Sequence, residues 1–317
     1  MRWWLVLSVC LAGCPAPPAA EPQLGGGGGG GGGFSEPIAP AQPRLDDSLI
    51  EFRFEGGHID FELWRQGSRV TQFARNRYAV PLVLRWSIPT FTNLTPLTPV
   101  EGVVVLPPAD KPSGTSQAVV LAELEVVDLT TRYRRELSYG AKFGDPRARP
   151  MQYAYRLPYP AGLTFSVLQG FHGAFSHRGS NEYAVDFDCP VATPVLAARD
   201  GTVIAYNAAA QGAGTTPDYL DYRRTNFVLV LHDDGTVGEY MHLSPSGIEV
   251  KPGQHVARGG RLALSGNTGF SSTPHLHFQV MTAGEDGASV QSFPFQLAVK
   301  PRRVEEPVQG RRYSAWE

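Results

Sequence analysis

Residues 274–280 read PHLHFQV, a stretch that alternates between polar and apolar side chains as a β-strand with one buried face does. Successive side chains of a strand point to opposite faces of the sheet. His275 and His277 therefore share one face, while the apolar residues between and after them point into a core. Two imidazoles held in this register are a suitable start for a metal site, but the pair needs further ligands.

The sequence around this stretch, from residue 160 to 299, is a series of short strand-like segments separated by glycine turns. Residues 195–206 indicate two strands around an Asp-Gly pair, and residues 227–240 indicate two more around a second pair. Asp-Gly between apolar runs is a strong hairpin signal, because glycine supplies the positive φ of a tight turn. We expect an antiparallel sheet domain with hardly any helix, and a polar loop at residues 207–225 beside a binding groove.

Further candidate ligands lie elsewhere in this part of the chain. His177 and Asp186 fall in one short stretch, and the apolar neighbours of Asp186 require its charge to meet solvent or a stabilising partner such as zinc. Catalytic zinc has three protein ligands from His, Asp or Glu and one open position. His177, Asp186 and His277 would supply these three. His242, at the end of a predicted hairpin strand, and His275 would remain beside the open position, as in a hydrolase.

The order of these motifs resembles that of the lysostaphin/LytM-type zinc metalloendopeptidases, which cut the peptide cross-links of bacterial peptidoglycan. The resemblance covers about residues 169–280 and includes the segments ATPV (192–195), DGTV (200–203), YMHL (240–243), VKPG (250–253) and SGNTG (265–269). It implies a C-terminal antiparallel peptidase domain of the duplicated hybrid motif type. It also implies that zinc binds to the three ligands above, and that His242 and His275 are the catalytic histidines.

The implied reaction is hydrolysis of a peptide bond by a water molecule that zinc activates. One of His242 and His275 would accept the proton of this water and the other would stabilise the oxyanion, and the sequence leaves the two roles open. The alternative is a catalytically silent envelope scaffold or an activator of another cell-wall hydrolase, because some relatives of these enzymes have lost metal ligands. A candidate for every ligand position favours the enzyme.

One departure from the family pattern concerns the first ligand. In the best-known members the first histidine precedes the aspartate by four positions, whereas nine positions separate His177 from Asp186. His172 is the rival first ligand, but His177 is closer to the strand that carries Asp186. Asp188 is a lesser rival to Asp186. Cys189, beside a proline, is more typical of a small buried residue than of a thiolate ligand.

Residues 1–13 combine one arginine with a short apolar core, which is the pattern of a secretory signal and is too short for a membrane-spanning helix. The sequence LAGC at residues 11–14 resembles a bacterial lipobox. That resemblance implies cleavage before Cys14, a lipid on its sulfur, and a mature protein anchored to a membrane of the bacterial cell envelope. Because Pro15 stands where an aspartate would favour the inner membrane, we expect an outer-membrane anchor facing the periplasm.

Three further segments complete the predicted organisation. Residues 14–43 are rich in proline and glycine and should form a solvated linker. Residues 44–159 contain roughly seven strand-like segments, which predict an immunoglobulin-like β-sandwich ahead of the peptidase domain. Residues 300–317 form a C-terminal tail. Because Cys10 leaves with the signal and Cys14 carries lipid, Cys189 has no disulfide partner.

The amino-acid composition and length exclude one class of function and bound the number of domains. The chain has 28 Lys and Arg against 30 Asp and Glu, with a formal net charge of -2. A protein that neutralises nucleic-acid phosphates needs a surplus of basic residues, so this balance excludes an electrostatic nucleic-acid binder. The 317 residues suit about two domains, each large enough for its own core. The strand-like segments predict a mostly β protein, and the family resemblance implies Zn²⁺ as cofactor and a peptidoglycan peptide as substrate.

Overall fold

The computed structural model describes residues 42–317. The predicted signal segment, Cys14 and most of the predicted linker lie outside these residues. The described part of the chain is built from strands, and its helices are the short 3-10 turns η1 (Gly179–Asn181), η2 (Pro217–Leu220) and η3 (Tyr222–Arg224). None of these is long and apolar enough to cross a membrane. The expectation of a mostly β protein is confirmed.

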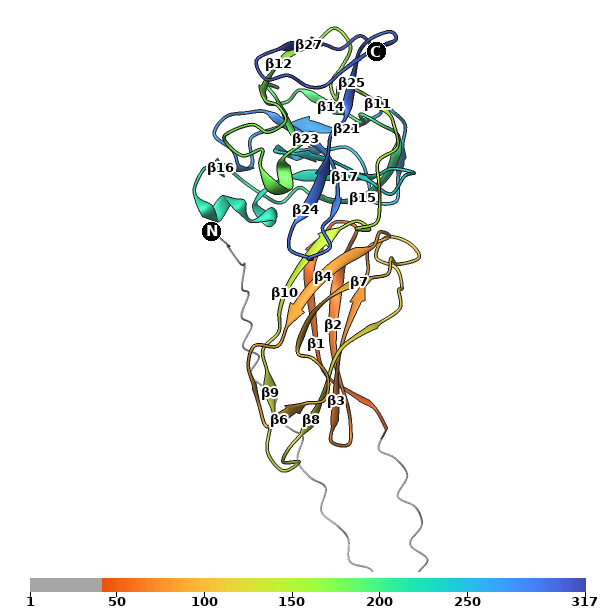
Figure 1. Ribbon diagram of the computed structural model, residues 1–317, viewed down its shortest axis with the longest axis vertical. Helices are drawn as coiled ribbons and strands as arrows, with labels where there is room; N and C mark the ends of the chain where they lie inside the picture. Colours follow the sequence, from red (N-terminus) through yellow and green to blue (C-terminus); the bar gives the residue numbers. More distant parts are fainter. Residues whose placement is uncertain (1–41) are drawn as a thin grey trace, which may run out of the picture.

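Strands β1 to β10 form an N-terminal block over residues 44–143, at the lower end of Figure 1. It has a five-stranded sheet in the order β1-β2-β3-β8-β6, a three-stranded sheet in the order β10-β4-β7, and the short pair β5-β9. Buried side chains of both larger sheets belong to one core. The immunoglobulin-like β-sandwich expected for residues 44–159 stays a prediction. The bounds are β1 (Arg44–Phe54), β2 (Gly57–Gln66), β3 (Arg69–Asn76), β4 (Leu82–Ser87), β5 (Phe91–Thr92), β6 (Leu94–Pro96), β7 (Glu101–Leu106), β8 (Val119–Val126), β9 (Arg134–Arg135) and β10 (Ser138–Phe143).

Strands β11 to β27 form a C-terminal block over residues 154–314, and its main element is a nine-stranded central sheet. The order of the central sheet is β20-β15-β17-β18-β23-β13-β12-β27, and β24 also pairs with β23. Its bounds are β12 (Thr164–Gln169), β13 (Val185–Phe187), β15 (Gly201–Asn207), β17 (Phe227–Leu231), β18 (Val237–Met241), β20 (His255–Val256), β23 (Leu276–Ala283), β24 (Val290–Phe293) and β27 (Arg312–Ser314).

Three smaller sheets surround the central sheet, in the orders β11-β25-β26, β14-β21-β19 and β16-β22. β11 falls within residues 44–159, predicted as the β-sandwich, but it pairs in parallel with β25 of the C-terminal block. The bounds are β11 (Ala154–Arg156), β14 (Pro194–Leu196), β16 (Ala213–Gly214), β19 (Leu243–Ile248), β21 (Arg261–Ser265), β22 (Gly269–Phe270), β25 (Gln296–Lys300) and β26 (Arg303–Glu305).

Of the two hairpins expected from Asp-Gly pairs, one forms and one does not. β17 and β18 pair directly, and Gly235 in the turn between them has φ 80°. The prediction of a hairpin within residues 195–206 is wrong, because β14 pairs with β21 and β15 pairs with β17. Gly201 is not a turn residue of positive φ: a Cβ at this position would clash with the carbonyl oxygen of Leu231 on β17. Glycine at this position instead allows β15 to lie close to β17.

The central sheet is buried on both faces, and alternate residues of its strands belong to different cores. On β23, Phe278 packs into the core of the C-terminal block. Met281 of β23 and Phe227 of β17 belong instead to the core that the N-terminal block also forms. His277 follows the parity of Met281 along this strand, so its side chain lies on the face toward the N-terminal block.

Aromatic rings and backbone hydrogen bonds join the two blocks on this face. The ring of Phe227 lies 5.2 Å from that of Phe54 on β1 and 4.4 Å from that of Tyr222 in η3. Reciprocal backbone hydrogen bonds of 3.1 Å link Glu55 to Tyr206 on β15. Buried aromatic rings contribute strongly to a core because of the large apolar area they remove from water. The N-terminal block therefore packs against the face of the central sheet that carries His277.

Candidate metal centre

Strand register brings the first two candidate ligands together. Asp186 on β13 is paired with His277 on β23, and His277 is paired in turn with Met241 on β18. Paired residues of neighbouring strands direct their side chains to the same face of a sheet. The hydrophobic pattern of PHLHFQV fixes this register, because a shift of one residue would turn Phe278 out of its core.

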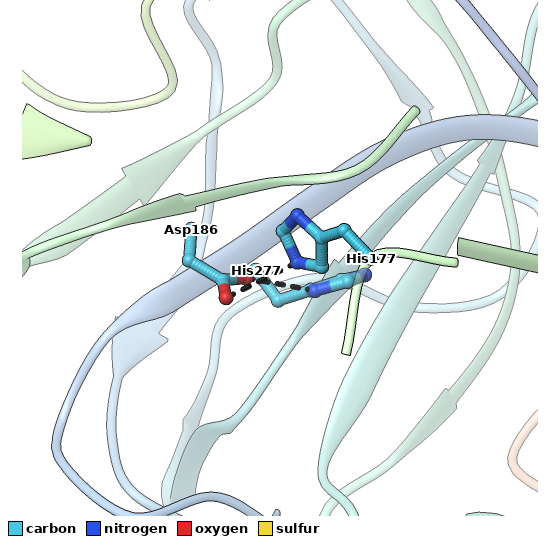
Figure 2. A group of neighbouring side chains, drawn as sticks. All are labelled: His177, Asp186 and His277. Carbon is cyan, nitrogen blue, oxygen red and sulfur yellow. Dashed lines mark hydrogen bonds and ion pairs between the residues drawn. The ribbon is translucent and has the colours of Figure 1, made fainter. Parts of the chain in front are cut away.

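His177 joins this pair from the loop that follows β12, as Figure 2 shows. Its Nε2 lies 3.1 Å from Oδ2 of Asp186, and the Nδ1 of His277 lies 2.9 Å from Oδ1 of the same carboxylate. One possible ligand atom from each of the three residues lies within 4.8 Å of the other two. All three residues are buried, with exposed fractions of 0% for His177, 4% for Asp186 and 5% for His277.

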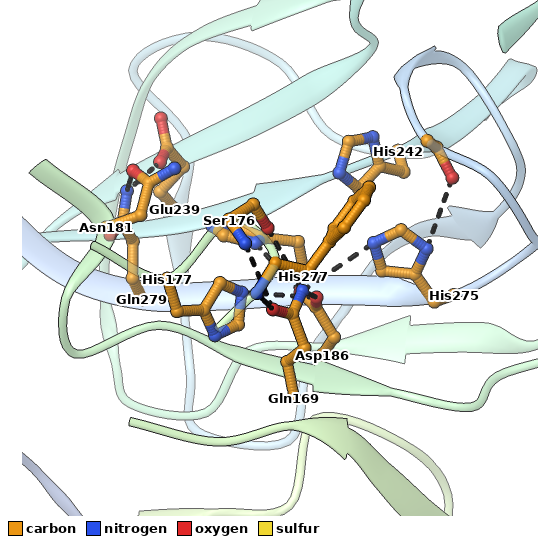
Figure 3. A network of polar contacts seen from close by, with 12 residues as sticks. Gln169, Ser176, His177, Asn181, Asp186, Glu239, His242, His275, His277 and Gln279 are labelled. Atoms are coloured by element: carbon orange, nitrogen blue, oxygen red, sulfur yellow. Dashed lines mark hydrogen bonds and ion pairs between the residues drawn. The ribbon is translucent and has the colours of Figure 1, made fainter. Parts of the chain in front are cut away.

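His242 and His275 flank this cluster, as the sequence predicted, and Figure 3 places both beside His277. Their ring centroids are 4.5 Å apart. The Nδ1 of His242 donates to the carbonyl of Thr268 at 2.7 Å, and the Nδ1 of His275 donates to the carbonyl of Thr273 at 2.8 Å. A histidine that donates from Nδ1 keeps Nε2 free to accept a proton or to face a ligand.

The backbone at His242 is unusual. Its φ of 62° lies in the left-handed region, which residues other than glycine rarely adopt. The residue lies between the end of β18 and the start of β19, where the chain leaves the central sheet. Backbone strain of this kind persists only where the surrounding structure enforces it, and it is concentrated at functional sites. The turn aims the imidazole of His242 at the cluster.

The charges of the cluster are strongly coupled. Burial opposes ionisation of Asp186, but its close contacts with His177 and His277 outweigh it and hold its pKa well below the usual range. Burial also disfavours the charged form of His177, yet the adjacent carboxylate of Asp186 raises the pKa of His177 above its ordinary value. Burial, together with the neighbouring His275 and His277, lowers the pKa of His242 to about 3. At neutral pH an ionised carboxylate therefore lies beside a neutral His242.

The residues of the cluster fit a zinc ion. The buried Nε2 atoms of His177 and His277 make no hydrogen bond, and the Nε2 of His177 has the Asp186 carboxylate beside it only as an ion-pair contact. Buried polar atoms normally have a hydrogen-bond partner, so each of these nitrogens has a lone pair that a metal ion would satisfy. Two imidazoles and one carboxylate are a ligand set typical of catalytic zinc. The Nδ1 of His177 donates to the carbonyl of Gly170 at 2.9 Å, an outer-shell contact that orients a metal-ligating imidazole.

The rival residues lie elsewhere. The side chain of His172 is 61% exposed and lies 3.1 Å from Glu182, outside the cluster. Asp188 is exposed, and Cys189 is a buried member of the core, as its sequence context indicated. The backbone carbonyls that orient His177, His242 and His275 could not be predicted from the sequence, because every residue has a backbone carbonyl. Gln169, which contacts Asp186, was not predicted either.

His232 lies outside the cluster, and its surroundings suggest a test of stability against pH. Its Nδ1 lies 3.0 Å from Oγ1 of Thr236 in the turn between β17 and β18, as expected for a residue that caps a hairpin. Only 3% of the residue is exposed. Burial, followed by the positive charge of Arg199, lowers the pKa of His232 to about 4.

We expect His232 to make the protein less stable in acid. The unfolded chain binds a proton at this histidine below about pH 6.5, whereas the folded chain resists protonation until about pH 4. The contribution of neutral, buried His232 to the free energy of unfolding is fully present above pH 6.5 and is lost as the pH falls toward 4. Between pH 7 and pH 5 the loss is about 2 kcal/mol, and the variant His232→Gln avoids it. Urea unfolding of both proteins at the two pH values measures the difference, and equal losses contradict the assignment.

Comparisons with known proteins show which family and which relatives the C-terminal block resembles. Residues 180–290 match the family model described as Peptidase family M23. The chain is 27% identical over 190 residues to Peptidoglycan DD-endopeptidase ShyA of Vibrio cholerae serotype O1, covering 58% of this chain and 40% of that protein. It is 36% identical over 126 residues to Glycyl-glycine endopeptidase ALE-1 of Staphylococcus capitis, covering 39% of this chain and 27% of that protein.

Among solved structures, the catalytic domain of the antimicrobial peptidase lysostaphin from Staphylococcus simulans is 28% identical, with a TM-score of 0.26 and coverage of 49% of this chain and 86% of that one. The chain spans less than half the length of the two curated relatives above. The matched range includes Asp186 on β13, His277 on β23, and His242 between β18 and β19. Residues 180–290 of the C-terminal block are thus similar to Peptidase family M23, and the relatives that the chain matches include endopeptidases and lysostaphin.

Proposed function

We propose that the protein is a zinc-dependent endopeptidase that hydrolyses the peptide cross-links of bacterial peptidoglycan. The observation that carries the proposal is the buried cluster of His177, Asp186 and His277, in which the Nε2 atoms of both histidines make no hydrogen bond. The names of relatives such as Peptidoglycan DD-endopeptidase ShyA support the substrate class. The near balance of acidic and basic residues is compatible with a peptide substrate and gives no basis for nucleic-acid binding.

In this proposal His177, Asp186 and His277 hold the zinc ion. When bound, zinc supplies a water molecule activated for attack at neutral pH and polarises the carbonyl of the scissile peptide bond. The carboxylate of Asp186 neutralises part of the metal charge, and its buried position excludes competing solvent. The carbonyl of Gly170 keeps the Nδ1 of His177 protonated, so that Nε2 presents a lone pair.

His242 and His275 supply proton transfer and oxyanion stabilisation. Thr268 and Thr273 accept hydrogen bonds from their Nδ1 atoms, which fixes both rings and leaves both Nε2 atoms available. One Nε2 accepts a proton from the attacking water, and the other, on a ring that carries a second proton, donates a hydrogen bond to the oxygen that becomes negative. The Nε2 of His275 lies 3.7 Å from Oδ1 of Asp186, close to the reacting centre. The presence of the full set of residues disfavours the scaffold alternative.

Mutation should distinguish the proposed zinc ligands from the two catalytic histidines. We expect His277→Ala to lose bound zinc and hydrolysis together, since it removes a ligand. We expect His275→Ala to keep zinc but to lose about 10²–10⁴ in rate, the usual contribution of a positioned acid or base. Zinc per chain is measured by elemental analysis, and the rate by new amino termini released from peptidoglycan.

The exposed His255 on β20 provides the matched control for these variants. His255→Ala removes an imidazole of the same size from a surface position and should change neither zinc content nor rate. A His277→Ala protein that is loaded with zinc and fully active would contradict the ligand assignment. A His275→Ala protein with unchanged rate would remove this residue from the reaction.

We also propose that the protein is a lipoprotein of the bacterial cell envelope, anchored through Cys14 and facing the periplasm from the outer membrane. The support is the sequence alone: an apolar segment at residues 1–13 and the tetrapeptide LAGC before Pro15. The proline- and glycine-rich segment at residues 14–43 would link the anchor to the catalytic domain and keep that domain near the wall.

Replacing the anchor residue tests this localisation. We expect Cys14→Ser to abolish lipid attachment and to move the protein from the membrane fraction to the soluble fraction. Cys10→Ser is the matched control, because Cys10 precedes the proposed cleavage position and leaves with the signal. Radiolabelled fatty acid and cell fractionation are the measurements. Lipid incorporation that survives Cys14→Ser would disprove the anchor.

A further inference from the structure

We propose that Gln169 is a positioning residue, which fixes the carboxylate of Asp186 and ties the loop of His177 to it. The inference rests on the proposed metal site. Gln169 is the last residue of β12 and is paired with Asp186 on β13, after an irregularity in the strand at Val167. Figure 3 shows its side chain between Asp186 and Ser176. The two ends of its amide contact different parts of the site.

The nitrogen of the amide acts on the carboxylate. Nε2 of Gln169 donates to Oδ2 of Asp186 at 2.8 Å. It also donates to Oγ of Ser176 at 3.0 Å. Because one carboxylate oxygen is held by a fixed donor, rotation of the group about its Cβ–Cγ bond is restricted, and the position of Oδ1 is fixed as well. Donation to the ionised form also stabilises the negative charge of Asp186.

The oxygen of the amide acts on the loop. Oε1 of Gln169 accepts hydrogen bonds from the backbone nitrogens of Phe175 at 3.2 Å and Ser176 at 3.1 Å. The next residue, His177, brings its imidazole into the cluster. Only one orientation of the amide satisfies these contacts, because two backbone donors require an oxygen and the Asp186 carboxylate requires a donor. One side chain therefore connects the segments of two proposed zinc ligands.

The loop is closely wrapped around this side chain. A Cβ at Gly173 would lie 3.0 Å from Oε1 of Gln169, so a side chain at this position would press on the amide. The carbonyl of Gly173 accepts from the backbone nitrogen of His177 at 3.1 Å, which closes the loop on itself. Removing the amide should thus loosen both the carboxylate and the loop, while the sheet beneath them stays intact.

The test compares zinc binding by the full chain with and without this amide. Gln169→Met keeps the length and volume of the side chain but forms none of the four hydrogen bonds. We expect zinc affinity about 10- to 100-fold weaker, as is usual when an outer-shell partner of a metal ligand is lost. Affinity is measured by competition with a chromophoric chelator. We also expect the visible absorption of the Co²⁺-loaded protein to change, since it reports ligand geometry.

Gln72 on β3 provides the matched control. It is fully buried in the N-terminal block, and its Nε2 donates to the carbonyls of Glu62 and Phe73. Gln72→Met should lower the melting temperature without changing zinc affinity or the cobalt spectrum. If Gln169→Met does not fold, Gln169→Asn takes its place, because its shorter amide stays polar but cannot reach both the loop and Asp186.

The outcomes distinguish this inference from the proposed function. Wild-type protein that binds no zinc, or Asp186→Asn protein that binds it as tightly as wild type, would refute the metal site itself. If wild type binds zinc and Asp186→Asn does not, the site stands. Under that condition, folded Gln169→Met protein with wild-type affinity and an unchanged cobalt spectrum overturns the role of Gln169, and a weakened affinity with an altered spectrum supports it.

Discussion

The ionised carboxylate of Asp186, buried in the central sheet, is the constraint on which the rest of the site depends. A buried charge is costly unless polar partners surround it. Its partners here are two histidines and one glutamine, which come from β23, the loop after β12 and β12 itself. β23 lies far from the other two segments in sequence, and the strand order β23-β13-β12 brings it beside them. Zinc at this place would satisfy the same charge more fully.

The face of the central sheet that carries the site is also the face on which the N-terminal block packs. Phe227 and Met281 lie on this face and share a core with the N-terminal strands. The opposite face is filled by the core of the C-terminal block, which includes Phe278. Neither block can slide without exposing a buried face of the same sheet. The position of His277 is thereby fixed from both sides, which suits a site that depends on short contacts.

The site was largely predictable from sequence because its residues lie in a strand with clear alternation. PHLHFQV indicated the strand, and the placement of His177 near Asp186 favoured it over His172, which the structure places outside the cluster. The hairpin within residues 195–206 was wrong because Gly201 serves strand packing rather than a turn. The core that the two blocks form together could not be predicted, because an apolar residue such as Phe227 indicates that it is buried but not which segment packs against it. Gln169 was missed because a single glutamine has many ordinary uses.

Release of new amino termini from isolated peptidoglycan, with and without a zinc chelator, tests the central claim most directly. The account predicts release by the purified protein, loss of that release when the chelator removes the metal, and recovery when zinc is added back. Release that continues unchanged in the chelator would contradict a zinc-dependent reaction. No release by protein that carries stoichiometric zinc would contradict peptidoglycan as the substrate.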